Sequence, residues 1–216
     1  ALTYKITRLP DSIVVAETTT GNEYIDNSIT KLNIYSYQIQ AITLDGAGPT
    51  ATTDRLVMGP ALTVPYRCNF ATDDQFALWN VIDANNDEYT WKRETTLAAA
   101  YYSYNEDGET GGDDWLVSSP IHLEKDKIYR LKFKLQSYDV SYPEKVAVHL
   151  GTGASVAEQT TLLGDYEVES NTFVEYKVIL PERLESGNYH ISFHCHSEPY
   201  MFIPVSYTHL RAHETR

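Results

Sequence analysis

The stretch that decides the fold covers residues 113–135 and reads DDWLVSSPIHLEKDKIYRLKFKL. Its Trp-Leu-Val run is broken by Ser-Ser-Pro at 118–120, and a charged turn at 124–127 leads into an alternating segment. In residues 129–135, every second side chain is apolar and the side chains between them are Arg or Lys. Alternation with a period of two over this length predicts an antiparallel strand with one buried and one solvated face.

The rest of the chain repeats this pattern in shorter pieces. No strong helical period occurs, and short alternating runs are separated by Gly, Pro, Asn and Asp, as in all-β sandwiches. Residues 60–65 form the clearest boundary, because prolines bracket a short extended link there. We therefore expect an all-β chain with two units, residues 1–59 and 60–203. The strands expected in the second unit are 67–70, 79–83, 97–104, 115–116, 129–137, 146–150, 172–180 and 189–196.

The charge of the chain limits its partners. Its 216 residues carry a formal net charge of −13 at pH 7. This charge disfavours nucleic acid and anionic membrane surfaces, because both attract proteins through basic residues. No apolar run approaches the roughly 20 residues of a membrane-spanning helix, and no signal peptide is found. The sequence thus predicts no nucleic-acid partner and no membrane insertion.

The C-terminal segment, residues 204–216, differs in character from the rest. VSYTHLRAHETR has no hydrophobic period and, over residues 205–215, reads as the translation of a transposase-type sequencing adapter. We therefore expect the biological chain to stop near Ile203 and residues 204–216 to be derived from an adapter. Without residues 205–216, 17 minus 2 basic and 30 minus 1 acidic residues leave a net charge of −14.

Residues 1–59 resemble the later strands of a fibronectin type III domain. The run ITKLNIYSYQIQAITLDGAG alternates over residues 35–41 and ends in a glycine-rich turn at 45–48. Ile29 stands six residues before Tyr35, as a Leu precedes the corner Tyr of that family, whose hydroxyl bonds the backbone. The early strands and their core Trp are missing. The resemblance therefore implies a partial fibronectin type III sandwich that is cut at its start.

The motifs of residues 60–203 carry a second resemblance. In chain order they are NFATDDQFALWNVIDANNDEYTW, AAAYYSYN, DDWLVSSPIHL, YRLKFKL and NYHISFHCHSEPYMFI. This unit resembles the cleaved adhesin or choice-of-anchor J family of secreted Bacteroidetes proteins, whose jelly rolls are repeated in gingipain haemagglutinin regions. The resemblance implies a galactose-binding-like jelly-roll β-sandwich, an extracellular or cell-surface location, and a last strand that this chain lacks.

The resemblance also implies a role. We expect a non-catalytic adhesion or binding module of a secreted or surface multidomain bacterial protein. Its partners would be a host surface protein or a glycan, and other domains of the same chain. Aromatic side chains stack on sugars and pack at protein interfaces, and the candidate ligand-binding residues are Trp91, Tyr101, Tyr102 and Tyr104. Two alternatives stay open: an accessory region of an extracellular hydrolase such as a peptidase, whose catalytic domain lies upstream, and a structural spacer.

Sequence motifs for catalysis are missing. The chain has no G-x-S-x-G, no P-loop, no H-E-x-x-H and no cysteine in a catalytic pattern with histidine. Its Gly-Thr-Gly at 151–153 lacks a third glycine and a following helix, and Ser-Ser-Pro at 118–120 is an extended break. We therefore expect that the chain is not an enzyme.

One acidic loop is a candidate calcium site. Asp83, Asn85 and Asp87 alternate in the segment IDANNDE, and hard cations need several oxygens that converge from a short loop. The central glycine and the distal glutamate of an EF-hand are missing, but the resemblance to adhesin jelly rolls implies calcium. The other interpretation is an Asx-rich turn that bonds its own backbone, and both stay open.

Histidines and cysteines give two further hypotheses. His190, His194 and His196 share one face of a strand. Because we expect this to be the outer face, we interpret them as ordinary surface side chains rather than as zinc or copper ligands. Cys68 and Cys195 both have the parity of inward positions. They form either a disulfide, in the oxidising setting implied above, or two buried thiols.

Overall fold

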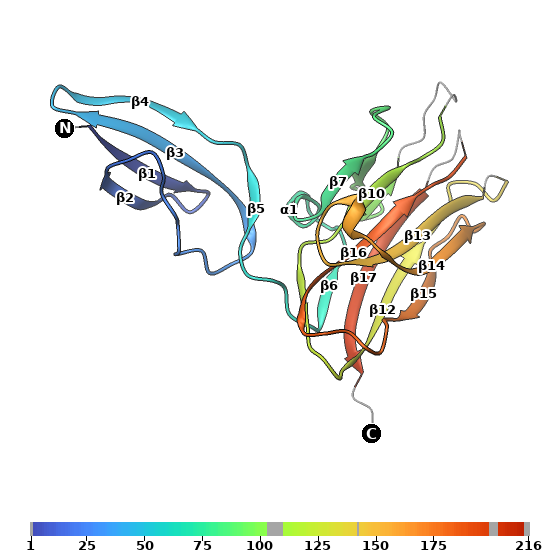
Figure 1. Ribbon diagram of the computed structural model, residues 1–216. Coiled ribbons are helices and arrows are strands. Elements are labelled where there is room, and N and C mark those ends of the chain that lie inside the picture. Colours follow the sequence, from blue (N-terminus) through green and yellow to red (C-terminus); the bar gives the residue numbers. More distant parts are fainter. Residues whose placement is uncertain (1, 103–109, 142, 199–202, 214–216) are drawn as a thin grey trace. The chain divides into compact units, whose positions relative to one another are not determined.

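The chain folds into two units that consist almost wholly of β-strands (Figure 1). The computed structural model describes residues 2–102, 110–141 and 143–198, and the backbone of residues 203–213. The two compact units are Ala1–Pro60 and Ala61–Arg216. The all-β fold class predicted from the sequence is confirmed. No helix within these described ranges is long and apolar enough to cross a membrane.

The first unit is a single antiparallel sheet. Its strands are β1 (Thr3–Leu9), β2 (Ile13–Thr19), β3 (Asn33–Thr43), β4 (Gly46–Thr52) and β5 (Leu56–Met58). The strand order is β2-β1-β3-β4, and β5 pairs with one end of β3. A sheet with an apolar face needs a second layer to bury it. Here a concavity of about 690 Å³ lies against the sheet and is lined by residues such as Ile6, Ile39 and Met58.

Tyr35 makes the contact predicted for a corner tyrosine. Its side chain is 5% exposed, and its hydroxyl donates a hydrogen bond of 2.9 Å to the carbonyl oxygen of Lys31. This bond joins the start of β3 to the loop before it. The assignment of the unit to the fibronectin type III family stays a prediction.

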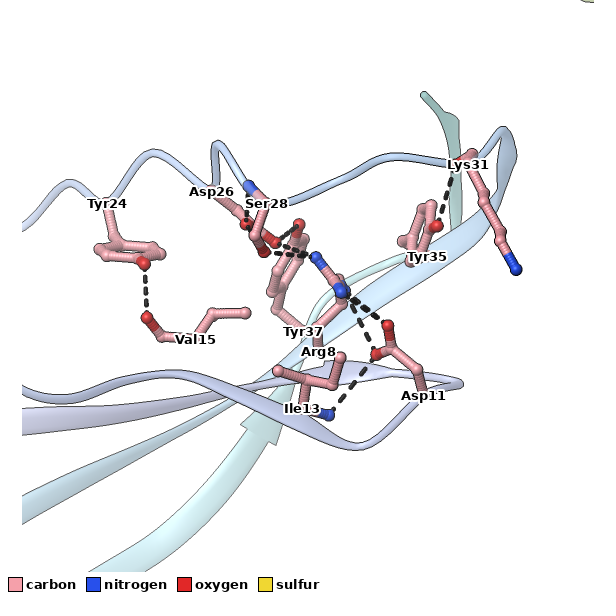
Figure 2. A network of polar contacts seen from close by, with 10 residues as sticks. All are labelled: Arg8, Asp11, Ile13, Val15, Tyr24, Asp26, Ser28, Lys31, Tyr35 and Tyr37. Atoms are coloured by element: carbon pink, nitrogen blue, oxygen red, sulfur yellow. Dashed lines mark hydrogen bonds and ion pairs between the residues drawn. The ribbon is translucent and has the colours of Figure 1, made fainter. Parts of the chain in front are cut away.

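A buried ionic network holds the loop between β2 and β3 against the sheet (Figure 2). Arg8 is 4% exposed. Its guanidinium donates to Asp11 Oδ2 at 2.6 Å, to Asp26 Oδ2 at 2.9 Å and to Ser28 Oγ at 2.8 Å. Burial would raise the pKa of Asp26, but hydrogen bonds from Ser28, Tyr37 and Arg8 lower it to about 2. The network therefore keeps both Arg8 and Asp26 charged although their side chains are almost fully buried.

The second unit is a sandwich of two six-stranded sheets. Its elements are β6 (Tyr66–Cys68), α1 (Asp73–Ala77), β7 (Asn80–Asp83), β8 (Trp91–Glu94), β9 (Ala99–Tyr102), β10 (Asp114–Val117), β11 (Ile121–Leu123), β12 (Ile128–Leu135), β13 (Glu144–Gly151), η1 (Val156–Glu158), β14 (Thr161–Val168), β15 (Val174–Ile179), β16 (Gly187–Cys195) and β17 (Ile203–His213). One sheet has the order β14-β13-β16-β10-β7, with β11 paired to β16. The other has the order β15-β12-β17-β9-β8, with β6 paired to β17.

The alternating stretch that was predicted to form a strand with one buried and one solvated face forms β12. Burial alternates along it, and Leu131, Phe133 and Leu135 are fully buried. Phe133 packs edge to face on Phe193 of the opposite sheet, with ring centroids 5.4 Å apart. Burying each such side chain contributes about 1.5–3 kcal/mol. The predicted strand and its inner face are therefore confirmed.

The neighbouring segment, β10, lies between β16 and β7, and all four of its residues are buried. The Ser118 amide donates to Ile191 O at 2.8 Å, and Ser118 Oγ accepts from the Ile191 amide at 2.9 Å. These two bonds attach the Ser-Ser-Pro segment, which follows β10, to β16. The carbonyl oxygen of Pro120 then accepts from the Leu62 amide at 2.8 Å.

The last described segment is a strand, and most of its residues belong to the segment predicted to derive from an adapter. The absence of the family's own last strand stays a prediction. β17 pairs with β12 on one side and with β9 and β6 on the other. Without a strand in this place, β12, β9 and β6 would each have unpaired backbone N–H and C=O groups along one side. An extended segment satisfies these groups through its own backbone. The origin of residues 204–216 in an adapter stays a prediction.

Candidate functional site

The loop after β7 and the segment before β10 meet at one end of the jelly roll. We call Asp83, Asn85, Asp87 and Asp114 the acidic pole. Register in the β7–β10 pair places Asp83 opposite Asp114. Asn85 Nδ2 donates to the carbonyl oxygen of Gly111 at 2.9 Å and to Asp87 Oδ2 at 3.1 Å. The sheet and these two bonds therefore bring all four side chains to one place.

The loop of the acidic pole closes on its own backbone. The two oxygens of Asp83 accept from the amides of Asp87 at 3.2 Å and Glu88 at 2.9 Å. Asp87 accepts from the Tyr89 amide at 2.9 Å and from the Thr110 hydroxyl at 2.7 Å. In the described part of the chain, no three His, Cys, Asp or Glu side chains already converge as a preformed metal site. The predicted Asx-rich turn is thus present, although each carboxylate oxygen keeps a further lone pair for a cation.

Asp114 is the member of the acidic pole that was not predicted from the sequence to be a metal ligand. Its side chain is 0% exposed. Burial raises its pKa to about 7, and the carboxylates of Asp83 and Asp87 add to this effect against a hydrogen bond from Thr90. Neither Asp114 Oδ1 nor Asn85 Oδ1 has a hydrogen-bond partner among the residues that the structure describes. Two buried oxygens without donors are an environment that a cation would satisfy.

Two of the four aromatic residues expected to bind a ligand lie in the core. Trp91 and Tyr102 are each 2% exposed, pack edge to face, and are register partners that both point inward. Trp91 Nε1 donates to the carbonyl oxygen of Asp114 at 3.0 Å. These two candidate ligand-binding residues therefore have almost no surface that a ligand could contact. Tyr101 is half-buried on the outer face of β9, and Tyr104 lies outside the described residues.

His190 and His194 of β16, and His196 just after its end, each contact a neighbouring segment. Their partners, at nitrogen-to-oxygen distances of 2.6–2.8 Å, are Ser118 O for His190, Asp113 Oδ1 for His194 and Asp165 Oδ1 for His196. The ring of His194 also stacks on Trp115 with centroids 4.0 Å apart, and burial lowers the pKa of His194. These contacts favour structural surface histidines over a zinc or copper site.

Both cysteines are buried free thiols. Cys68 is 3% exposed and Cys195 is 0% exposed, and no disulfide joins them. Burial raises the pKa of each thiol. Of the two interpretations given above, the structure has the pair of buried thiols.

Comparisons with solved structures bear on the second unit. The K1 cleaved adhesin domain of Lys-gingipain from Porphyromonas gingivalis W83 matches with a TM-score of 0.55 and 20% identity, over 69% of this chain and 98% of that domain. The K3 domain of the same protein matches with a TM-score of 0.52 and 18% identity, over 67% of this chain and 95% of that domain. The BiXyn10A CBM1 structure matches with a TM-score of 0.50 and 14% identity, over 70% of this chain and 99% of that chain. No family model and no curated protein matches the sequence.

These likenesses define a class of fold. The second unit is a jelly-roll β-sandwich of the kind found in adhesin and carbohydrate-binding domains. Within that class, it has the fold of the cleaved adhesin domains of Lys-gingipain, as the sequence motifs predicted.

Proposed function

We propose that this chain is a non-catalytic binding module of a secreted or surface-attached bacterial protein, with a host protein or a glycan as its target. The observation that carries the proposal is the fold. A single jelly roll here corresponds to 98% of a gingipain adhesin domain and to 99% of the BiXyn10A CBM1 chain. Folds host many functions, so the target has to be found by experiment.

The target class is tested by screening the full chain for binding. We expect the protein, folded and supplied with calcium, to retain either a subset of glycans on an array or a host extracellular-matrix protein in a pull-down. Thermally unfolded protein serves as the control. A blank result in both screens would contradict the proposal and favour a structural spacer.

We also propose that calcium binds at the acidic pole. Asp114 Oδ1 and Asn85 Oδ1 are buried oxygens without donors in the described chain. The carboxylates of Asp83 and Asp87 are close enough to raise the pKa of Asp114. Carboxylate and amide oxygens are the ligands that calcium prefers. The binding of a divalent cation would also offset the repulsion among these three carboxylates.

Calcium is expected to stabilise the second unit. At a concentration about 100 times its Kd, a ligand that binds only the folded state adds about 2.7 kcal/mol to the free energy of unfolding. Tryptophan fluorescence during urea unfolding reports this unit, since Trp79, Trp91 and Trp115 all lie in it. Asp114→Asn should abolish the calcium effect, while magnesium should reproduce little of it. Equal unfolding curves in calcium and in EDTA would refute the site.

A further inference from the structure

Four cationic side chains gather on the outer face of one sheet of the jelly roll. The alternation of β12 turns Arg130, Lys132 and Lys134 away from the core, and all three are half-buried. Register pairs Lys132 with Lys177 of β15, so these two lie side by side on that face. We call Arg130, Lys132, Lys134 and Lys177 the basic face.

Cationic side chains outnumber carboxylates on the two strands of the basic face. Within β12 and β15 the only acidic residue is Glu175, the register partner of Lys134, so the two strands hold four cations and one carboxylate. Glu175 Oε1 lies 3.5 Å from Lys132 Nζ and 3.1 Å from Lys177 Nζ, so it is shared by two lysines. Arg130 Nε has no hydrogen-bond partner among the described residues. A local excess of positive charge thus exists on a chain whose net charge is −13.

Protection of a sheet edge does not explain this arrangement. Lysines on edge strands block unwanted strand pairing, and that role fits Lys177 because β15 is the outermost strand. β12, in contrast, is paired on both sides, with β15 and β17. As long as β17 occupies this place, the three cations of β12 protect no edge, and this favours a role for them in binding.

The spacing of the cations suits an extended anionic chain. Residues two apart on a strand are about 7 Å apart, and neighbouring strands are about 4.8 Å apart. Lys132 pairs in register with His209 of β17, and His209 pairs with Arg67 of β6. Arg67 is therefore in the same row across the sheet as Lys132, and their backbones are roughly 10 Å apart. The basic face and Arg67 therefore form a grid of positive charges. Such a grid can contact a polymer whose anionic groups repeat along its length.

We propose that the basic face binds a polyanionic glycan that carries sulfate or carboxylate groups. The inference rests on the proposed function as a binding module and names the target class and the surface. A glycan contacts only the face on which it lies. Duplex nucleic acid and an anionic bilayer have dense charge over a wide area, so they are repelled by the acidic remainder of the chain. Each exposed ion pair contributes only about 0.2–1 kcal/mol, so several must act together.

The test measures binding of the full chain to heparin at about 50 mM salt, where ionic contacts to polyanions are strong. The double variant Lys132→Glu/Lys134→Glu should lose affinity by about tenfold or more. The control Lys125→Glu/Lys127→Glu makes the same change in net charge in the exposed turn before β12, where each lysine pairs with a glutamate. We expect the control to bind within about twofold of the wild type.

Three outcomes would overturn the proposal: no heparin binding by the wild type, an equal loss in both double variants, or tighter binding to a DNA duplex or to phosphatidylserine vesicles than to heparin. Dextran serves as the neutral glycan control. Failure on heparin together with a positive screen on a neutral glycan or a host protein would reject the basic face alone. Failure in every screen would reject the proposed function as well.

Discussion

Replacing Arg8 with alanine is expected to unfold the first unit. The substitution removes the cation that faces Asp26, whose side chain is 6% exposed. Removing one partner of a buried ion pair costs about 3–5 kcal/mol. That is comparable with the whole stability of a small domain, and this single sheet has an open apolar concavity. Arg8→Lys should also destabilise the unit, because an ammonium cannot reproduce the fork of contacts to Asp11, Asp26 and Ser28.

Amide hydrogen exchange of the full chain measures this effect, with peptides from β1 and β3 reporting the first unit. Tryptophan fluorescence provides an internal reference, because all three tryptophans lie in the second unit and their unfolding curve should stay unchanged. Arg55→Ala is the matched control, since it removes an exposed arginine from the same unit. Slow exchange in β1 and β3 of the Arg8→Ala variant, equal to that of the wild type, would show that the network is dispensable.

The strand β12 could be predicted from the sequence because its alternation is long and regular. The strand β14 was not predicted, because Gly164 interrupts its alternation of side chains. At this point the pairing of β14 with β13 also shifts in register, between Val148 and His149. The helix α1 is missed as well. It has only five residues, and a cap on Thr72, whose side chain accepts from the Gln75 amide, marks its start. Elements this short leave no period in the sequence.

The candidate site shows where residue type misleads. Trp91 stands at the start of a four-residue strand, and so short a strand offers no alternation that tells inward from outward. Tyr101 and Tyr102 are consecutive in β9, so only one of them can face solvent. Asp114 was not predicted to be a buried strand residue, because aspartate is more common in exposed loops than in strand interiors. Its parity with the inward Leu116, two residues later, is the signal that could have revealed its buried position.

Lowering the pH from about 8.5 to about 5.5 is expected to stabilise the second unit through Glu144. This side chain is 1% exposed. Burial raises its pKa to about 8, although the Ser197 hydroxyl donates to it at 2.6 Å. A carboxyl whose pKa is raised by folding binds its proton more tightly in the folded state. Its contribution is therefore fully present below its unfolded pKa of about 4.5 and is lost as the pH rises through about 8.

The variant Glu144→Gln isolates this contribution, because a glutamine is neutral at every pH and its oxygen can still accept from Ser197. Relative to the wild type, the variant should gain roughly 3 kcal/mol in free energy of unfolding between about pH 5.5 and about pH 8.5. Urea unfolding in EDTA, followed by tryptophan fluorescence, measures it. The difference between the two proteins also cancels the opposite effect of His149 and His194, whose pKa values burial lowers. Glu198→Gln, at an exposed pair with Lys145, should change stability by less than about 0.5 kcal/mol at either pH. A constant offset between wild type and Glu144→Gln would mean that Glu144 is ionised throughout, so that its burial is compensated by hydrogen bonds to the charged form.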